Sequence, residues 1–141
     1  MQTVKIGIIG CGNISSKYFA TARAFRILEC VACADALPER AQARAQEFSI
    51  PRACSVEALL ADPEIEIVVN LTTPQAHTAI NLAAIAAGKH VYTEKPLAIA
   101  REDGARVLAA AQAAGVRVGC APGTFLGGGL QTCRKIIDDG A

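Results

Sequence analysis

Residues 3–15 read TVKIGIIGCGNIS and hold the strongest structural signal in the chain. The apolar run at residues 3–9 is rich in β-branched side chains, which predicts a short strand. Residues 10–15 then form a G-x-G-x-x-S pattern, one position away from the glycine fingerprint of dinucleotide-binding domains. A helical pattern follows directly. A glycine loop between a strand and a helix is the context in which this fingerprint holds a pyrophosphate, because the helix N-terminus presents N–H groups to the anion.

The positions of this loop have separate expected roles. Gly10 is predicted to form the tight turn, and Gly12 is predicted to let the backbone approach a pyrophosphate. Asn13 and Ile14 are assigned to the same cofactor-binding loop. Ser15 replaces the third small residue of the fingerprint. Because serine is also small, we expect only a modest adjustment where the helix packs on the strand.

The remainder of the chain alternates between strand and helix patterns. Further strands are predicted at residues 28–34, 52–55, 64–72, 89–93 and 116–121. Helices are predicted at residues 13–26, 38–48, 56–62, 74–88, 101–115 and 130–140. Near-continuous apolar strands that alternate with helices are typical of a parallel sheet covered on both faces. The predicted fold class is therefore α/β, with a doubly wound, mostly parallel sheet of the Rossmann type.

Several helix ends have recognisable residues. Ser55 is predicted to cap the third helix. Thr73 is predicted to cap the fourth helix, where Pro74 suits the first turn. Gly88 and Gly115 are predicted to end the fourth and fifth helices, because glycine adopts the left-handed conformation at low cost.

Composition argues against several classes of function. The 141 residues carry a net charge of +1, and the longest basic run is Arg134-Lys135, so we expect no nucleic-acid or anionic-membrane surface. No apolar stretch reaches the ~18 residues of a membrane span. The N-terminus lacks the basic segment and long apolar core of a signal peptide. We therefore predict a cytoplasmic protein whose six cysteines are free thiols.

Cys30 and Cys33 form a C-x-x-C pair, which also occurs in redox and zinc sites. Both lie in the predicted strand at residues 28–34, where an offset of three sends side chains to opposite faces. The chain has no second C-x-x-C to complete a four-cysteine zinc site. We predict a structural role for both cysteines and no metal site.

Asp35 follows the second predicted strand, 20 residues after Ser15. In dinucleotide-binding domains an acidic residue at this place accepts hydrogen bonds from the adenosine ribose and repels the 2′-phosphate of NADP. Asp35 therefore favours NAD, but it could also be the N-cap of the next helix, and both roles can coexist. Arg40 has two interpretations: it stacks on the adenine, or it is a solvated charge on its helix.

A second class of protein uses a similar loop. Residues 10–14, GCGNI, also look like the glycine loop of methyltransferases that bind S-adenosylmethionine. That loop usually has an acidic residue two positions before its first glycine, and this chain has Ile8 there. The dinucleotide interpretation is preferred for this reason.

Two later segments hold the remaining candidate residues. Residues 70–74, NLTTP, end the fourth predicted strand, and residues 93–96, TEKP, end the fifth. His77 lies one turn into the fourth helix. The carboxyl ends of parallel strands converge on one crevice, where ligands bind in open sheets. We therefore expect Glu94 and Lys95 to lie beside the glycine loop.

With these residues the sequence resembles the glucose–fructose oxidoreductase, inositol dehydrogenase and MocA-like family (Gfo/Idh/MocA). The resemblance covers essentially the whole chain. It rests on IGIIGCGNIS, on VVNLTTPQAHTAINLAAIAAGKHVYTEKPLA and on the final helix. The second stretch is highly specific, because its N-x-T-P-x-x-H and AGKHV-x-x-EKP motifs combine spacing and residue type over about thirty positions.

The resemblance implies roles for individual residues. Lys95 would be the active-site lysine, near the nicotinamide ribose and the substrate hydroxyl. Glu94 would help to form the pocket around that ribose, and the bond between Lys95 and Pro96 would be cis. His77 belongs to the expected cofactor-binding set, or it satisfies the start of its helix. Thr72, Thr73 and Pro74 would form a wall of the cofactor site, and Leu71 belongs to the same expected cofactor-binding set.

The resemblance also implies a function for a parent enzyme. It would be an NAD-dependent oxidoreductase, with NADP the less favoured cofactor, acting on a sugar, cyclitol or related polyol as a homo-oligomer. Residues 1–122 would form the dinucleotide-binding domain, and residues 123–141 a bridging turn and helix. The triglycine at residues 127–129 itself is interpreted as a flexible turn into the last helix, in preference to a second phosphate loop. The family's second, substrate domain would be missing from this chain. The alternative is a non-catalytic NAD-binding fragment.

Overall fold

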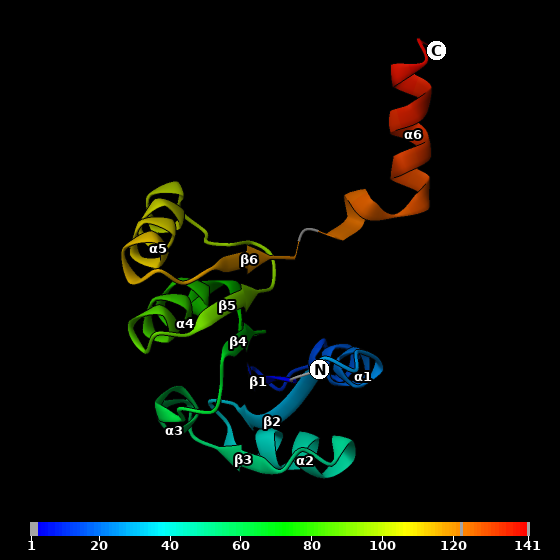
Figure 1. Cartoon of the computed structure of the whole chain (residues 1–141). Helices are drawn as coiled ribbons and strands as arrows, with labels where there is room; N and C mark the ends of the chain where they lie inside the picture. Colours follow the sequence, from blue (N-terminus) through cyan, green and yellow to red (C-terminus); the bar gives the residue numbers. More distant parts are fainter. Residues whose placement is uncertain (1–2, 122, 141) are drawn as a thin grey trace.

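The computed structural model describes residues 3–121 and 123–140, which form a layered α/β fold (Figure 1). The strands are β1 (Val4–Ile9), β2 (Leu28–Ala34), β3 (Arg52–Cys54), β4 (Ile67–Asn70), β5 (His90–Thr93) and β6 (Val118–Cys120). The helices are α1 (Ser15–Ala24), α2 (Pro38–Phe48), α3 (Val56–Ala61), α4 (Pro74–Ala86), α5 (Arg101–Ala114) and α6 (Gly128–Asp138), with a 3-10 turn η1 (Gly123–Leu126). The predicted alternation of strands and helices is confirmed.

The strands form one sheet in the order β3-β2-β1-β4-β5-β6, and every neighbouring pair is parallel. The predicted doubly wound sheet is therefore confirmed. The strand order reverses at β1 and β4, and such a reversal opens a crevice at the carboxyl ends of the strands. The segments after β1, β2, β4 and β5 meet at this edge.

Two apolar cores hold the layers together. Helices α1 and α2 cover one face of the sheet, while α3, α4 and α5 cover the other (Figure 1). On the first face, Phe19 of α1 packs with Ile8 of β1, and both are fully buried. On the second face, Leu59, Ile85 and Val107 belong to one buried cluster with the strands. Burial on both faces explains why the strands read as near-continuous apolar runs.

The fourth strand is shorter than predicted, because it begins at residue 67 and ends at residue 70. Before it, Asp62 forms a turn in which its Oδ1 accepts a hydrogen bond from the Glu64 backbone N–H (2.8 Å). The alternating pattern that starts at residue 64 therefore includes part of a loop. A polar side chain that binds its own backbone competes with strand pairing, and apolar spacing does not reveal that competition.

The predicted helix ends are largely confirmed. The Ser55 hydroxyl accepts a hydrogen bond from Ala58 N–H (3.1 Å), as a capping serine does. Gly88 and Gly115 adopt left-handed conformations, with φ of 73° and 68°. Thr73 occupies the N-cap position of α4, but its side chain makes no capping hydrogen bond with the described residues.

The prediction that Cys30 and Cys33 lie on opposite faces is wrong. The pairing of β1 with β2 passes from Ile6 and Cys30 to Gly7 and Ala32, so Val31 is an extra residue in β2. This bulge changes the alternation by one position, and both cysteines pack against the core beneath α1 and α2. A bulge depends on the neighbouring strand, so residue spacing within β2 could not reveal it.

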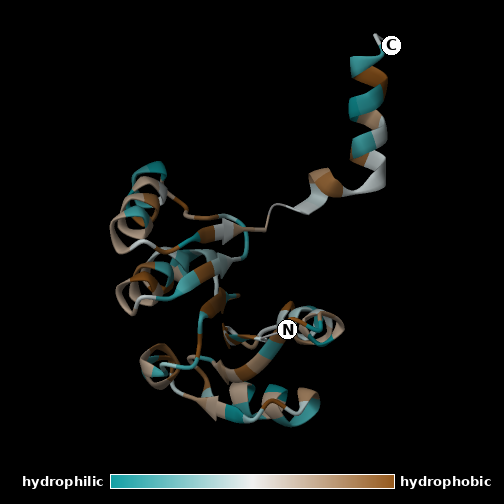
Figure 2. Cartoon of the chain, in the orientation of Figure 1, coloured by the Kyte–Doolittle hydropathy of each residue, from teal (hydrophilic) through white to brown (hydrophobic). Residues whose placement is uncertain are grey.

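The segment after β6 also differs from its prediction. Gly127 is the N-cap of α6, and Gly128 and Gly129 lie within its first turn, so the triglycine is not a flexible turn. Helix α6 extends away from the sheet (Figure 1), and Figure 2 shows both strongly polar and strongly apolar residues on it. Within the described part of the chain, the helices are too short or too polar to cross a membrane.

Candidate functional site

A cleft of about 430 Å³ opens at the carboxyl edge of the sheet. It lies between the glycine loop after β1, the segment after β2 and the segment after β4. Seven of the residues assigned to a cofactor site from the sequence line it: Gly10, Gly12, Asp35, Arg40, Leu71, Thr72 and Thr73. The remaining assigned residues lie in the same segments or in the turn after β5.

The glycine loop leaves room for a ligand on one side only. Gly10 has φ of 102°, and a Cβ there would lie 2.5 Å from the Leu71 carbonyl carbon. Gly12 is different, because an added Cβ would meet no atom of the chain within 4 Å. Gly10 is therefore required by the fold, whereas the space beside Gly12 is open and suits the close approach of a pyrophosphate.

Ser15, the first residue of α1, is bonded to the glycine loop. It is fully buried, and its hydroxyl donates a hydrogen bond to the Gly12 carbonyl oxygen (2.6 Å). The serine in place of the third fingerprint residue thus connects the start of α1 to the loop.

Cys11 is also buried, and contact with Cys33 together with burial raises the pKa of its thiol. The loop therefore carries no thiolate that would repel an anion.

Asp35 faces the glycine loop. One carboxylate oxygen accepts a hydrogen bond from Cys11 N–H (2.7 Å), and the other accepts from Leu37 N–H (2.9 Å). The N-cap of α2 is Leu37, so Asp35 is not the cap that one interpretation of the sequence expected. Two carboxylate oxygens can accept about four hydrogen bonds, and ribose hydroxyls could use the remaining capacity.

Two arginines border the same loop from α2. Arg40 is exposed and lines the cleft near Asp35. Arg44 donates a hydrogen bond to the Gly12 carbonyl oxygen (3.4 Å) and pairs with Glu47 (2.5 Å). Sequence reasoning missed Arg44. Its spacing of four from Arg40, which places both on one helix face, was the available signal.

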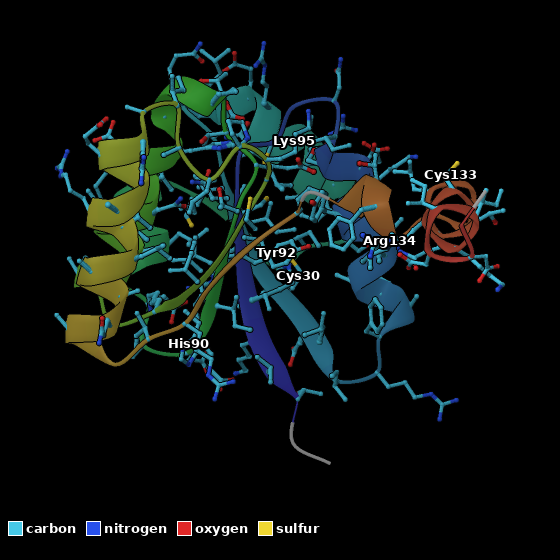
Figure 3. The ribbon with its side chains drawn as sticks, turned by 90° about the horizontal axis from the view of Figure 1, so that it is seen from above. Cys30, His90, Tyr92, Lys95, Cys133 and Arg134 are labelled. Carbon is cyan, nitrogen blue, oxygen red and sulfur yellow. The ribbon has the colours of Figure 1, made fainter. Side chains whose placement is uncertain are left out.

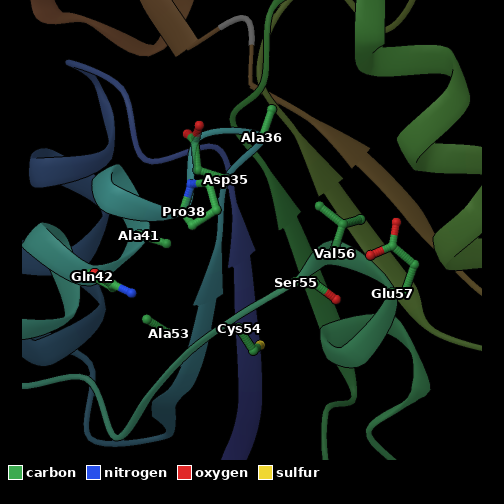
Figure 4. Close-up of a pocket in the computed structure, with 10 residues that line it drawn as sticks. All are labelled: Asp35, Ala36, Pro38, Ala41, Gln42, Ala53, Cys54, Ser55, Val56 and Glu57. Carbon is green, nitrogen blue, oxygen red and sulfur yellow. The ribbon is translucent and has the colours of Figure 1, made fainter.

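A second cavity of about 400 Å³ adjoins the cleft at Asp35 (Figure 4). Figure 4 shows Asp35, Ala36 and Pro38 on one side of it, with Ser55, Val56 and Glu57 across from them. Asp35 and Val56 line both cavities. The two spaces are therefore neighbours that share lining residues.

His77 lies beneath the cleft, with only 1% of the residue exposed. Its Nδ1 is 2.6 Å from the Pro96 carbonyl oxygen, and its Nε2 is 3.0 Å from the Thr72 carbonyl oxygen. The ring therefore connects the segment after β4 with the turn after β5. The Asn70 amide, buried beside it, donates to the His77 carbonyl oxygen (3.2 Å) and accepts from Thr72 N–H (3.1 Å).

The turn after β5 carries Glu94 and the exposed Lys95. The bond between Lys95 and Pro96 is cis, as the family resemblance implied. Figure 3 shows Lys95 at the end of the sheet toward which the strands run, whereas His90, at the start of β5, lies at the opposite end. Lys95 is thus at the same edge as the glycine loop.

Tyr18 is a second residue that sequence reasoning missed. Its hydroxyl, on α1, donates a hydrogen bond to Glu94 Oε1 (2.8 Å). Burial and this hydrogen bond raise the pKa of Tyr18, so the hydroxyl remains a donor at neutral pH. Glu94 Oε2 accepts a hydrogen bond from Lys95 N–H (2.9 Å). The position of Tyr18, three residues after Ser15, was the one local signal of its place near the loop.

Comparison with known proteins agrees with this geometry. The model of the Gfo/Idh/MocA oxidoreductase family, described as an NAD-binding Rossmann fold, matches residues 4–121. The chain is 40% identical over 114 residues to 1,5-anhydro-D-fructose reductase of Ensifer adhaerens, covering 80% of this chain and 34% of the relative. It is 34% identical over 120 residues to inositol 2-dehydrogenase of Salmonella typhimurium, covering 83% and 36%. The chain thus spans about a third of the length of these relatives.

Solved structures show the same fold. The WlbA dehydrogenase of Bordetella pertussis, in complex with NADH and UDP-GlcNAcA, matches with a TM-score of 0.90 and 30% identity over 99% of this chain and 40% of that one. Biliverdin reductase of Synechocystis, in complex with biliverdin and NADP+, matches with a TM-score of 0.88 and 31% identity over 96% and 43%. Similar structures thus include both NADH and NADP+ complexes.

Proposed function

The chain belongs to the Gfo/Idh/MocA oxidoreductase family, and on that premise we propose that it is the NAD-binding domain of an oxidoreductase. The main support for the proposal is the open space beside Gly12, at a cleft formed where the strand order reverses. A ligand with a pyrophosphate suits that space, and α1 begins just behind it. The adenosine half would extend past Asp35 into the cavity of Figure 4.

The assigned residues divide by the part of the cofactor that they would contact. Gly12, Asn13 and Ile14 would hold the pyrophosphate, and Gly10 would form the turn that presents them. Asp35 and Arg40 would contact the adenosine half. Toward the nicotinamide end, the proposed contacts are Leu71, Thr72, Thr73, Pro74, Glu94, Lys95 and Pro96. His77 would support this end from beneath, since it binds the carbonyl oxygens of Thr72 and Pro96.

The proposed reaction is hydride transfer between the cofactor and a carbinol carbon of a sugar, cyclitol or related polyol. A bound nicotinamide ring supplies the hydride acceptor or donor. The Lys95 side chain, exposed at the same edge, would accept the substrate hydroxyl proton as the neutral amine when the alcohol is oxidised, and would return that proton as the ammonium group when the ketone is reduced. The names of the relatives support this substrate class, because one reduces anhydrofructose and another oxidises inositol.

Binding by the 141-residue chain tests the cofactor proposal. Calorimetric titration with NAD, NADP and S-adenosylmethionine should show binding of NAD, about tenfold weaker binding of NADP, and no binding of S-adenosylmethionine. Preferred binding of S-adenosylmethionine, or no binding of either dinucleotide, would contradict the proposal. We expect the chain by itself to oxidise no polyol, which is the behaviour of a binding fragment.

The role of Lys95 is tested in a longer protein that contains this chain. Lys95→Ala should retain NAD binding and lower turnover by at least about 100-fold, the usual contribution of a group that transfers a proton. The exposed Lys17 provides the control, because Lys17→Ala removes the same charge from α1. Turnover of the Lys95→Ala protein at the wild-type rate would remove Lys95 from the mechanism.

Residues 1–122 are proposed as the dinucleotide-binding domain and residues 123–141 as a separate bridging segment. The limits of the family match, which ends at residue 121, support this division. The parent enzyme is proposed to be a cytoplasmic homo-oligomer.

A further inference from the structure

The Glu94 carboxylate is held at both of its oxygen atoms. Oε1 accepts a hydrogen bond from the Tyr18 hydroxyl (2.8 Å), and Oε2 accepts one from Lys95 N–H (2.9 Å). The Glu94 backbone N–H donates to the Asn70 carbonyl oxygen (2.9 Å). The backbone contact fixes the turn on β4, and the carboxylate joins that turn to helix α1. Glu94 is therefore a bridge between three elements.

Among these three partners, Tyr18 is the one farthest from Glu94 along the chain. It lies on α1, which starts directly after the glycine loop, 76 residues before Glu94 in the sequence. Its ring packs beside Tyr92 of β5, with ring centroids 6.5 Å apart. The aromatic contact places the hydroxyl, and the hydroxyl orients the carboxylate.

Without Tyr18 the carboxylate would have greater freedom. A glutamate side chain on a surface turn samples several rotamers, and fixing it in one rotamer when a ligand binds costs conformational entropy. A charge-assisted hydrogen bond from a partly buried donor limits that sampling before a ligand arrives. The geometry thus preorganises Glu94 and the Lys95 turn.

We propose that Tyr18 is a positioning residue that acts through Glu94 to preorganise the nicotinamide end of the cofactor site. This inference rests on the proposed function, because it needs Glu94 and Lys95 to face the nicotinamide ribose. It goes beyond that function by assigning a specific role to a residue of α1. Loss of the hydroxyl should weaken contacts to the nicotinamide half and leave the adenosine half unaffected.

The test compares two ligands on the 141-residue chain. NADH contains both the adenosine and the nicotinamide halves, whereas ADP contains only the adenosine and the diphosphate. Tyr18→Phe keeps the ring and removes the hydroxyl, and it should raise the dissociation constant for NADH about tenfold and change that for ADP less than twofold. Tyr92→Phe is the matched control, because it removes a hydroxyl from the adjacent ring. Among the described residues that hydroxyl makes no hydrogen bond, so both constants should stay unchanged.

A double variant tests whether the effect passes through Glu94. In a Glu94→Ala background, Tyr18→Phe should cause no further loss of NADH affinity, because the acceptor of its hydrogen bond is gone. A further tenfold loss would overturn the inference. Equal losses for NADH and ADP in Tyr18→Phe would show a general structural defect and would also overturn it. Unchanged NADH affinity in Tyr18→Phe would also overturn the inference.

The outcome for the wild-type chain separates this inference from the proposed function. If the wild type binds neither NADH nor ADP, the proposed function fails and the role of Tyr18 fails with it. If the wild type binds both and Tyr18→Phe binds both equally well, the proposed function stands and only the role of Tyr18 is removed. Thermal unfolding of each variant without ligand verifies that the fold is intact.

Discussion

Gly12 separates the requirements of folding from those of binding. An added Cβ at this position meets no atom of the chain within 4 Å, and its φ lies outside the left-handed region. Gly12→Ala should therefore leave the thermal unfolding midpoint unchanged or slightly raised, since alanine restricts the unfolded chain. The same methyl group would occupy the space of the pyrophosphate, so the affinity for NAD should fall about tenfold. Thermal unfolding and calorimetry of one variant measure both effects.

Gly10→Ala is the contrasting variant. Gly10 has φ of 102°, and its added Cβ would lie 2.5 Å from the Leu71 carbonyl carbon. This variant should lose stability in the absence of any ligand, because backbone atoms must move.

The two glycine variants thus separate stability from affinity. If Gly12→Ala bound NAD with the affinity of the wild type, the pyrophosphate would have to lie elsewhere.

Asp35 controls the choice of cofactor in our proposal. Two like charges ~4 Å apart interact unfavourably by ~4 kcal/mol at an effective dielectric near 20. If salt screening and relaxation leave one third of that energy, ~1.4 kcal/mol, the dissociation constant for NADP is about ten times that for NAD. Asp35→Ser should reduce or abolish this preference, because Arg40 and Arg44 then face a 2′-phosphate without an opposing carboxylate. Dissociation constants for NAD and NADP at low and high salt measure the change.

Glu39→Gln is the control for Asp35→Ser. It removes a carboxylate from the first turn of α2, where Glu39 is exposed. The ratio of the two dissociation constants should stay near its wild-type value. If Asp35→Ser gains no affinity for NADP, the carboxylate does not face the ribose and serves only to hold the Cys11 and Leu37 backbone.

At the scale of elements, Lys89 links the end of α4 to the loop before β4. The residue is 5% exposed, and its ammonium group donates to the carbonyl oxygens of Asp62 (2.6 Å) and Ile65 (2.9 Å). Lys89→Met keeps the length of the side chain but leaves both carbonyl groups without this donor. The free energy of unfolding should fall by about 2 kcal/mol. Urea denaturation measures the fall.

Lys17→Met provides the comparison for Lys89→Met. Lys17 is exposed on α1, and substitutions at such sites usually change stability by less than ~0.5 kcal/mol. Equal stability of the Lys89→Met variant and the wild type would mean that water replaces the ammonium group at both carbonyl oxygens. The loop before β4 would then be accessible to solvent.

The order and type of the elements were predictable because their signals are local. Ser55 caps α3 through a contact three residues away, and Gly88 and Gly115 end their helices through their own backbone conformations. The boundaries were less predictable where a neighbour decides them. The bulge at Val31 exists only in the pairing with β1, and the turn at Asp62 shortens the start of β4.

At the scale of the whole molecule, we expect the segment after residue 122 to be separable from the sheet. The residues of η1 and α6 are exposed throughout, including Leu130 at 50% and Ile137 at 68%. A chain that ends at Ala121 should therefore unfold at the same temperature as the 141-residue chain and bind NAD with the same affinity. Thermal unfolding with and without NAD checks this expectation and the proposed domain boundary.

A longer deletion, which removes a strand of the sheet, provides the comparison for the chain that ends at Ala121. A chain that ends at residue 117 lacks β6, which pairs with β5 through Val91, Tyr92 and Thr93. That chain should unfold at a lower temperature, since the turn after β5 loses its neighbour. A similar loss in the chain that ends at Ala121 would show that α6 supports the sheet.

Apolar periodicity, glycine positions and the motifs after the strands were sufficient to predict the parallel sheet and the residues at its carboxyl edge. These signals work because each reports a contact or a conformation within a few residues. The predicted site residues of the glycine loop and of the segments after β2, β4 and β5 follow from strand order alone, since parallel strands bring their ends together.

The hydrogen bonds that arrange those residues depend on contacts between distant parts of the chain. Tyr18 reaches Glu94 across 76 residues, and Asp35 binds Cys11 across 24. His77 connects two carbonyl groups that belong to different strand ends. No spacing in the sequence encodes such partners, because they are selected by how α1, α4 and the strands pack against one another. The location of the cleft was therefore predictable from residue patterns, but the hydrogen bonds that support its lining arise only from tertiary packing.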